Sequence, residues 1–266
     1  MLEFSVLSSG SSGNALYLRS ATTQLLLDAG ISGRQLQTRM EAVGACSFDE
    51  LDGVLITHEH IDHVRGLKQV LKHSQTPVYT TEGTWSQIVM EEYASRWHGI
   101  QDGKGFSIGD ILVQPFAVSH DAEEPVAFRF SSHGDSVAVV TDLGYMSEHI
   151  KSIIEGCQAY VLETNHDVEM LRAGRYPWSV KRRILSDKGH LSNHDAAVAL
   201  ADLLGDGTVD VYLAHLSQEN NQPDLAEITV QSLLREMKPS YLEQTRLFRT
   251  SRYQPTQIHT FNSVRA

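Results

Sequence analysis

Cysteine, proline and long apolar runs are scarce in this chain of 266 residues. Its two cysteines, Cys46 and Cys157, are too few for a disulfide framework, and we expect reduced thiols in a cytoplasmic protein. No apolar run approaches the roughly 20 residues of a membrane span, and the acidic, polar start does not resemble a signal peptide. No repeat, low-complexity segment or Pro/Gly/Ser-rich linker divides the chain. We therefore predict one domain, residues 1–266, and no membrane partner.

Basic residues are also in the minority. The chain has 22 Lys and Arg against 33 Asp and Glu, a formal net charge of −11 with histidine neutral. Such an acidic excess argues against a generic nucleic-acid coat protein. With 41% hydrophobic and 21% charged residues, the chain is also too apolar to be disordered. Histidine is abundant instead, with 13 residues, three of which fall within six positions.

Short apolar or β-branched runs alternate with helical patterns along the chain, which predicts a mixed α/β protein with two sheets covered by helices. Strands are expected at Glu3–Leu7, Ala15–Arg19, Gln24–Asp28, Gly53–Thr57, Val78–Thr80, Ile111–Ser119, Val126–Ser131, Val137–Thr141, Ala159–Glu163, Val209–Ala214 and Gln257–Phe261. Helices are expected at Ser32–Val43, His63–His73, Glu82–Ser95, after Met146, and at Trp178–Leu185, Asn193–Leu204 and Asp224–Met237.

The sequence His58-Glu59-His60-Ile61-Asp62-His63 directly follows the predicted strand Gly53–Thr57. Imidazole nitrogen and carboxylate oxygen suit zinc and similar divalent ions. Residues two apart in an extended strand end point the same way, so His58 and His60 converge on one ion. Asp62 and His63 lie where the chain turns into a helix and can face a second position. The alternative is a solvated loop or helix cap that is rich in histidine.

Three further candidate ligands each follow an apolar, β-rich run, which is the context of His58. They are His120, Asp142 and His215. Taken singly, each is equally a polar residue that closes a strand. The context that they share favours the interpretation as ligands.

The string HEHIDH, then a single His, an Asp in TD and a last His, resembles the metallo-β-lactamase superfamily. The resemblance implies a four-layer αββα sandwich of two mixed sheets flanked by helices, with pseudo-repeated halves at about 1–125 and 126–266. It also implies two divalent metal ions, of which Zn, Mn and Fe all suit the ligands. It assigns His58, His60 and His120 to the first metal, Asp62, His63 and His215 to the second, Asp142 to both, and Asp28 of LLLDAG to support of the site.

Four further strings resemble the YycJ/WalJ branch, bacterial proteins treated as DNA exonucleases: SVLSSGSSGNALYL, LETNHD, RRILSDKGHLSN and LAHLSQENN. This resemblance implies a DNA substrate and 5′-to-3′ polarity. A more distant resemblance links the chain to a cyclic phosphodiesterase of phosphonate metabolism and to a tRNA-processing ribonuclease. The alternatives are a metal-dependent hydrolase of a small thioester, lactone or cyclic phosphodiester, and a non-catalytic metal-binding module.

A phosphodiester substrate agrees with the residues themselves. Two divalent ions against Asp62 and Asp142 leave the inner site positive, which favours an anion. The ions lower the pKa of a bound water toward neutrality, and we expect Asp62 to orient that water and accept its proton. His190 is the predicted general acid for the departing oxygen. The alternative for His190 is an ordinary loop histidine.

Three short segments are predicted to contact substrate. The Ser/Gly loop Ser8–Asn14 offers hydroxyl and backbone N–H groups, and its candidates are Ser12 and Asn14. Ser192 and Asn193 open a helix whose N-terminus can bind an oxyanion, and Asn165 and His166 follow a predicted strand. The alternatives are a hairpin loop for the first segment and helix caps for the others. The remaining histidines, His73, His98, His133, His149, His194 and His259, are expected to be solvated.

Basic residues gather in two parts of the chain despite the acidic total. The first group is Arg172, Arg175, Lys181, Arg182, Arg183 and Lys188, and the second is Arg235, Arg246, Arg249 and Arg252. Tyr176 and Trp178 lie within the first group and offer rings that can stack on bases. We expect the first group to line the approach of DNA. The alternative is a solvated helix face with ordinary core aromatics.

Overall fold

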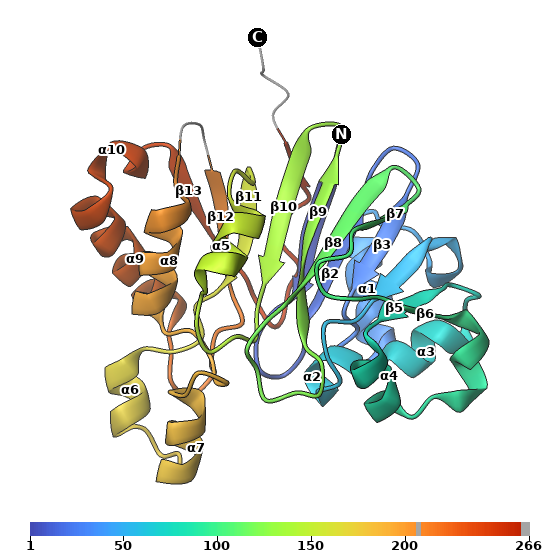
Figure 1. Ribbon diagram of the computed structural model, residues 1–266, viewed down its shortest axis with the longest axis horizontal. Coiled ribbons are helices and arrows are strands. Elements are labelled where there is room, and N and C mark those ends of the chain that lie inside the picture. The colour runs from blue at the N-terminus through green and yellow to red at the C-terminus, as the bar shows by residue number, and fades with distance from the viewer. Residues whose placement is uncertain (206–208, 262–266) are drawn as a thin grey trace.

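A computed structural model describes residues 1–205 and 209–261, which form two seven-stranded β-sheets packed face to face (Figure 1). Helices cover the outer face of each sheet, so that the layers follow the order helix, sheet, sheet, helix. The predicted αββα sandwich of two mixed sheets is confirmed. Within the described residues, no helix is both long and apolar enough to cross a membrane.

The first sheet has the strand order β14-β1-β2-β3-β4-β5-β6. Its strands are β1 (Glu3–Ser8), β2 (Ala15–Arg19), β3 (Gln24–Leu27), β4 (Gly53–Leu55), β5 (Val78–Thr80), β6 (Trp97–Gly99) and β14 (His259–Thr260). The second sheet has the order β13-β12-β11-β10-β9-β8-β7. Its strands are β7 (Phe106–Ile108), β8 (Ile111–Ala117), β9 (Val126–Ser132), β10 (Asp135–Val140), β11 (Ala159–Glu163), β12 (Val209–Ala214) and β13 (Thr245–Arg249).

The α-helices are α1 (Gly33–Ala42), α2 (Ile61–Val64), α3 (Leu67–Lys72), α4 (Glu82–Ile88), α5 (Glu148–Ile154), α6 (Val168–Ala173), α7 (Trp178–Ile184), α8 (Asn193–Leu203), α9 (Pro223–Met237) and α10 (Pro239–Leu242). Two 3₁₀ segments, Phe48–Glu50 and Glu91–Arg96, complete the connections. Ser32 begins α1 with a capping box, in which its hydroxyl accepts from the Gln35 N–H while the Gln35 side chain reaches back.

Apolar side chains fill all three spaces between the layers. Phe128 and Phe130 of β9 are fully buried among the side chains between the two sheets. Leu36 and Met40 of α1 belong to the core that covers the first sheet, and Leu200 of α8 belongs to the core that covers the second. The inner strands of both sheets are therefore buried on both faces, which explains their nearly continuous apolar sequences.

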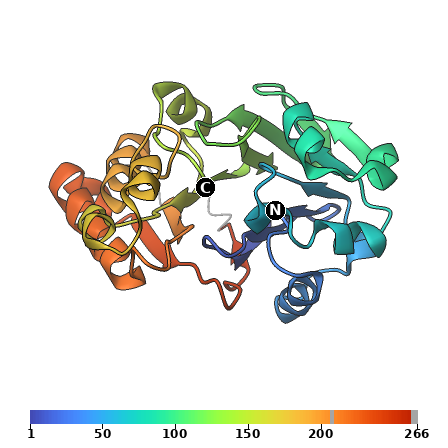
Figure 2. The same cartoon turned by 90° about the horizontal axis from the view of Figure 1, so that it is seen from below.

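Parallel strands place several chain segments at one end of the sandwich. Strands β3 to β6 are parallel in the first sheet, and β10 to β13 are parallel in the second. Side chains that follow the carboxyl ends of such strands meet at the same edge, where open α/β sheets bind their ligands. This edge lies at the bottom of Figure 1, and Figure 2 views the molecule from that end.

Two predicted helices are interrupted. The helix expected at His63–His73 is split into α2 and α3 at Gly66, where a Cβ atom would lie 2.2 Å from the carbonyl oxygen of Ile31. The helix expected at Glu82–Ser95 ends at Ile88, because Val89 adopts a left-handed conformation with φ 51° that no helix continues. The chain then continues as a 3₁₀ segment. Both interruptions arise from local contacts and backbone dihedral angles, which the spacing of apolar residues does not predict.

The sequence did not predict the edge strands β6, β7 and β13 or the short helix α10, whereas α6 begins at the helix start expected near Asp167. Edge strands are short and partly exposed, so that their alternation is weak. The chain passes from the first sheet to the second between β6 and β7, and returns with β14, which lies within the expected strand Gln257–Phe261. The pseudo-repeated halves at about 1–125 and 126–266 stay a prediction. Both cysteines are free thiols, as expected.

Replacing Gly30 with alanine tests the packing of the ligand-bearing turn. A Cβ atom there would lie 1.6 Å from the Asp62 carbonyl oxygen and 2.6 Å from the Asn14 amide nitrogen. We expect Gly30→Ala to lower the free energy of unfolding by about 3 kcal/mol or more in urea titrations. The control, Gly105→Ala, meets its nearest atoms at 3.6 Å and should change stability by less than about 1 kcal/mol. Equal stability of the two variants would contradict this packing.

Candidate metal centre

The structure brings all seven predicted ligands to the edge where the parallel strands end. His58 follows β4, Asp142 follows β10, and His215 follows β12 directly. Their side chains form overlapping groups of potential ligand atoms that lie within 4.8 Å of one another. The groups are His58, His60 and His120; His58, His63 and Asp142; Asp62, His63 and His215; and Asp142, Glu163, His190 and His215.

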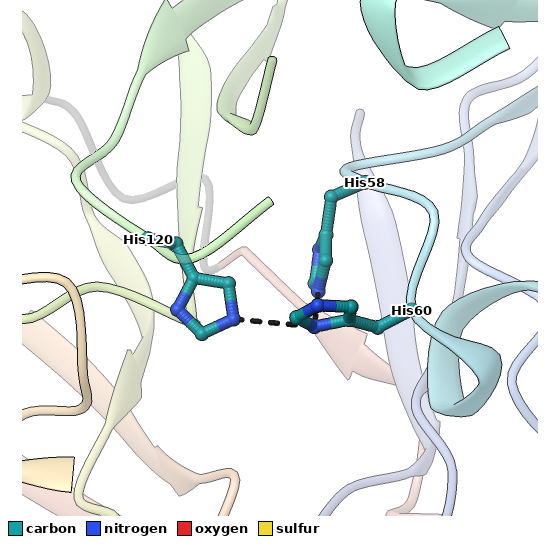
Figure 3. A group of neighbouring side chains, drawn as sticks. All are labelled: His58, His60 and His120. Atoms are coloured by element: carbon teal, nitrogen blue, oxygen red, sulfur yellow. Dashed lines mark hydrogen bonds between the residues drawn. The ribbon is translucent and has the colours of Figure 1, made fainter. Parts of the chain in front are cut away.

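Three imidazoles converge in the first group (Figure 3). His58 Nε2 lies 3.0 Å from His60 Nδ1, and His120 Nε2 lies 3.3 Å from the same atom. His58 and His60 stand at alternate positions after β4, as the spacing predicted, whereas His120 comes from the connection after β8. Three nitrogen atoms at such distances form one face of a coordination shell.

The Nδ1 atoms of His58 and His120 are held by groups behind the cluster. The Thr57 hydroxyl lies 3.0 Å from His58 Nδ1, and the carbonyl oxygen of Gly189 lies 3.2 Å from His120 Nδ1. Such contacts fix the orientation and tautomer of each ring and leave Nε2 for a ligand. Thr57 was not predicted as a site residue, although it is the last residue of the expected strand Gly53–Thr57.

The second group faces the first across Asp142. Asp62 Oδ2 lies 3.8 Å from His63 Nε2 and 3.7 Å from His215 Nε2. One Asp142 oxygen lies 3.2 Å from His63 Nε2, and the other lies 3.8 Å from His120 Nε2. Asp142 therefore stands between the two histidine groups, which is the position expected of a shared ligand.

Two buried carboxylates support the histidines from behind. Asp28 Oδ2 lies 2.8 Å from His63 Nδ1, as its predicted supporting role requires. Glu163, which is fully buried, lies 2.7 Å from His215 Nδ1 and 2.8 Å from His190 Nδ1. Glu163 was not among the site residues predicted from the sequence. The sequence pattern that could have indicated Glu163 is the one shared by the candidate ligands, because Glu163 is a carboxylate at the end of the apolar strand AYVLE.

Burial and neighbouring charges set the pKa values in the cluster. Burial, reinforced by the neighbouring imidazole of His63, lowers the pKa of His58 well below its ordinary value. Burial also opposes charge on His215, but the carboxylates of Asp142, Asp62 and Glu163 outweigh it and raise its pKa to about 10. In return, His190 and His215 overcome the effect of burial on Glu163 and lower its pKa to about 2. The carboxylates at the centre are thus ionised and require positive charge beside them.

Three site residues have left-handed backbone conformations where their strands end. The φ angles are 57° for Asp28, 60° for Asp142 and 55° for His215. Aspartate and histidine tolerate this region better than most residues, but each position still costs of order 1 kcal/mol. The turn redirects the chain immediately after a straight strand and delivers the side chain to the edge. Strain of this kind persists where surrounding contacts fix the site.

The donor set fits divalent cations. Asp142 Oδ2 and His215 Nε2 are buried and make no hydrogen bond to any described residue. Buried polar atoms without partners are rare because they cost free energy, and here two of them face the same cluster. Imidazole nitrogen and carboxylate oxygen are ligands for Zn, Mn and Fe. A divalent cation would satisfy both atoms and balance the ionised carboxylates.

The predicted substrate loop reaches the cluster through Asn14. The Asn14 side-chain oxygen accepts from the Gly10 N–H at 2.9 Å, which leaves its Nδ2 3.1 Å from His63 Nε2. Ser12 is exposed at the tip of the loop, and its carbonyl oxygen accepts from Arg65. Loop Ser8–Asn14 is therefore more than a simple hairpin turn, because it presents an amide donor to the site.

Three of the other four predicted substrate residues have defined contacts within the protein. Asn165 donates to the His215 carbonyl oxygen at 2.8 Å, and the Ser192 hydroxyl caps α8 by accepting from the Asp195 N–H. Asn193 is 1% exposed and exchanges two hydrogen bonds with Asn221. The Ser192 contact is the helix cap named as its structural alternative, whereas Asn165 and Asn193 join separate segments of the chain.

His166 is different, because it is 1% exposed and neither ring nitrogen has a hydrogen-bond partner within the described chain. Burial lowers the pKa of His166 to about 4, so that the ring is neutral near pH 7.

The first basic group does not form one continuous face. Lys181 is buried and donates to the carbonyl oxygens of Arg172 and Gly174, so it joins α7 to the end of α6. Arg183 pairs with Asp121 at 3.3 Å, beside the ligand His120. Trp178 is 64% exposed, which is not the burial of an ordinary core aromatic.

One histidine lies where the sequence analysis did not expect it. His259 was predicted to be solvated, but it is buried against Phe4, Tyr212 and Phe261. Short strand β14 carries it into the space between the sheets, and the sequence near the chain end did not indicate that pairing. The other five histidines expected to be solvated are exposed.

Comparison with known proteins gives consistent results. Residues 23–215 match the family described as the beta-lactamase superfamily domain. The chain is 44% identical to exodeoxyribonuclease YycJ of Bacillus anthracis over 264 residues, which covers 97% of this chain and 98% of the relative. It is 42% identical to exodeoxyribonuclease WalJ of Streptococcus pneumoniae over 86% of each chain. The metallo-beta-lactamase fold protein YhfI from Bacillus subtilis superposes with a TM-score of 0.74 at 16% identity, covering 96% of this chain and 98% of YhfI.

Glu163→Gln tests whether the missed carboxylate supports the metal ligand His215. The amide keeps the shape but removes the negative charge beside His215 Nδ1, so we expect affinity for a divalent metal to fall about 10- to 100-fold. Metal competition titrations monitored with a chromophoric chelator measure it. Glu169→Gln, at an exposed position on α6, is the control and should bind metal as the unmodified protein does. Unchanged affinity in Glu163→Gln would refute the supporting role.

Proposed function

This chain belongs to the metallo-β-lactamase superfamily and, within it, to the family of exodeoxyribonucleases YycJ and WalJ, and we propose that it is a metal-dependent DNA exonuclease of the cytoplasm. The proposal depends on one observation, which is that two features lie together at one edge of the sheets. One is the cluster of seven ligand side chains, and the other is the His190–Glu163 pair beside it. A hydrolase of phosphodiesters needs both a site for cations and a group that supplies a proton.

We propose that two divalent ions bind, with Zn, Mn and Fe as the candidates. His58, His60 and His120 would hold one ion, Asp62, His63 and His215 the other, and Asp142 would contact both. When bound, such ions offset the charge of the phosphate and make water more acidic. The ions would place positive charge at the site itself, which would let an acidic protein accept an anionic substrate there.

Asp62 and His190 have complementary roles in this proposal. The Asp62 side chain is 18% exposed, and its carboxylate orients the attacking water and accepts its proton. The His190 side chain is 14% exposed, and the Glu163 carboxylate fixes its ring through Nδ1. His190 can then donate a proton from its other nitrogen to the departing sugar oxygen. Base and acid thus come from different segments, Asp62 from α2 and His190 from the connection before α8.

Substrate contact is proposed for the residues that reach the site from its margin. The Asn14 amide donates toward a phosphate oxygen, and Ser12 offers its hydroxyl from the loop tip. The buried His166 ring retains an unused N–H that suits a water or phosphate oxygen in the same region. For Asn165, Ser192 and Asn193 the internal contacts described above make their part in binding indirect, through the placement of His215 and the start of α8.

A panel of variants and substrates tests the assigned chemistry. We expect Asp62→Ala and His60→Ala to lower kcat for DNA digestion at least about 1,000-fold while the proteins stay folded. End-labelled single-stranded and duplex DNA, a phosphodiester dye ester and a lactoylthiol ester are assayed side by side. The labels also report the 5′-to-3′ polarity, which stays a prediction. His98→Ala, at an exposed position on β6, is the control. Full activity in both site variants, or turnover of the thioester alone, would contradict the proposal.

The exposed basic residues of α7 are proposed to line the approach of DNA. Arg182→Glu combined with Arg183→Glu should weaken DNA binding about uniformly across sequences and reduce the steepness of its salt dependence, because phosphate contacts release counterions. Fluorescence anisotropy at several salt concentrations measures both quantities. Arg235→Glu on α9 changes the net charge elsewhere on the surface and should have little effect. If affinity and salt slope of the double variant match the unmodified protein, α7 does not face the substrate.

A further inference from the structure

The loop Ser8–Asn14 has a second neighbour besides the metal centre. On one side, Ser9 Oγ accepts from the His215 N–H, and Asn14 Nδ2 lies 3.1 Å from His63 Nε2. On the other side, the Ser9 N–H donates to the Ser251 carbonyl oxygen at 3.1 Å. Figure 2 shows the chain that follows β13 passing beside the tip of the β1–β2 turn. Segment Ser251–Thr256 therefore lies next to the margin of the active site.

A buried arginine holds this segment in place. Arg39 of α1 is 8% exposed and donates to two carbonyl oxygens, those of Leu7 at 3.0 Å and Arg252 at 2.8 Å. Burial lowers the pKa of Arg39, and none of the acidic residues in the described chain pairs with it. Thr256 adds hydrogen bonds to Val6 from the far end of the segment. The segment is thus fixed against β1, although it has no regular secondary structure.

The fixed segment presents an exposed ring with an unpaired cation beside it. Tyr253 is 73% exposed, more than most large side chains, and the Arg252 guanidinium lies 5.8 Å from its ring centre. Arg246 and Arg249 pair with acidic residues, whereas Arg252 has no acidic partner in the part of the chain that the structure describes. An open aromatic face with a free cation matches the alternation of base and phosphate in a nucleic-acid strand.

We propose that Arg252 and Tyr253 hold an unpaired strand of DNA beside the metal centre, with one base stacked on Tyr253 and a phosphate contacted by Arg252. This inference rests on the nuclease function proposed above and specifies how DNA enters the site, namely with an unpaired strand end. A base inside a blunt duplex is already stacked on both sides, so the Tyr253 face serves only a frayed or single-stranded end. The SSGSSGN loop links this platform to the reacting centre through Asn14.

The test measures kcat/KM for a single-stranded oligonucleotide and for bis(p-nitrophenyl) phosphate, which is too small to span the platform. We expect Tyr253→Ala to lower the ratio of the first value to the second about 5- to 100-fold, the loss of one stacked base. Tyr253→Phe keeps the ring and should restore the ratio to within about twofold of the unmodified protein. Arg252→Ala should reduce the salt slope of DNA turnover by about 0.7, the value for one phosphate of a single strand.

The control is Ile228→Ala, which truncates an exposed apolar side chain elsewhere, on α9. It should leave the ratio and the salt slope unchanged. An unchanged ratio in Tyr253→Ala would overturn the proposal. So would an equal loss for both substrates, since that outcome shows a disturbance of the loop Ser8–Asn14 and not of strand binding. Failure of the unmodified protein to digest either single-stranded or duplex DNA would instead refute the proposed function itself.

Discussion

The pairing of buried carboxylates with buried imidazoles is the constraint on which the rest of this structure depends. Asp28 fixes His63 from behind, and Glu163 fixes both His215 and His190. Ionised carboxylates this deep in a protein require positive partners, so histidines and cations must gather where the carboxylates lie. The sandwich meets this requirement by ending its parallel strands at one edge, where left-handed turns at Asp28, Asp142 and His215 deliver the side chains.

The sequence predicted the architecture and indicated the seven candidate ligands that the structure brings to one edge, because apolar strands with ligand-type residues directly after them form a regular pattern. Glu163 also follows an apolar strand pattern. It lies in the string LETNHD, however, which entered the prediction only through its resemblance to the YycJ/WalJ branch. Interruptions at Gly66 and Val89 could not be predicted, since they come from a close backbone approach and from a backbone dihedral. The burial of Lys181 and His259 likewise depends on partners distant in the sequence, namely the end of α6 and the neighbouring sheet.

Overall charge and local charge give different information in this protein. A net charge of −11 suggested that nucleic acid would be repelled. The structure shows that many basic residues are neutralised by local partners, as in the pairs Arg246–Asp210 and Arg249–Glu227. Arg182 and Arg252 have no such pair among the described residues, and both belong to segments beside the site. We therefore expect DNA binding to be confined to the surroundings of the metal centre.

Metal reconstitution tests the central claim most directly. Protein stripped of metal is given increasing amounts of Zn, Mn or Fe, and bound metal and digestion of end-labelled single-stranded DNA are measured in the same samples. The account predicts no digestion without metal and activity that rises with occupancy until two ions are bound per chain. Digestion by the metal-free protein, or two bound ions of every candidate metal without any digestion, would contradict it.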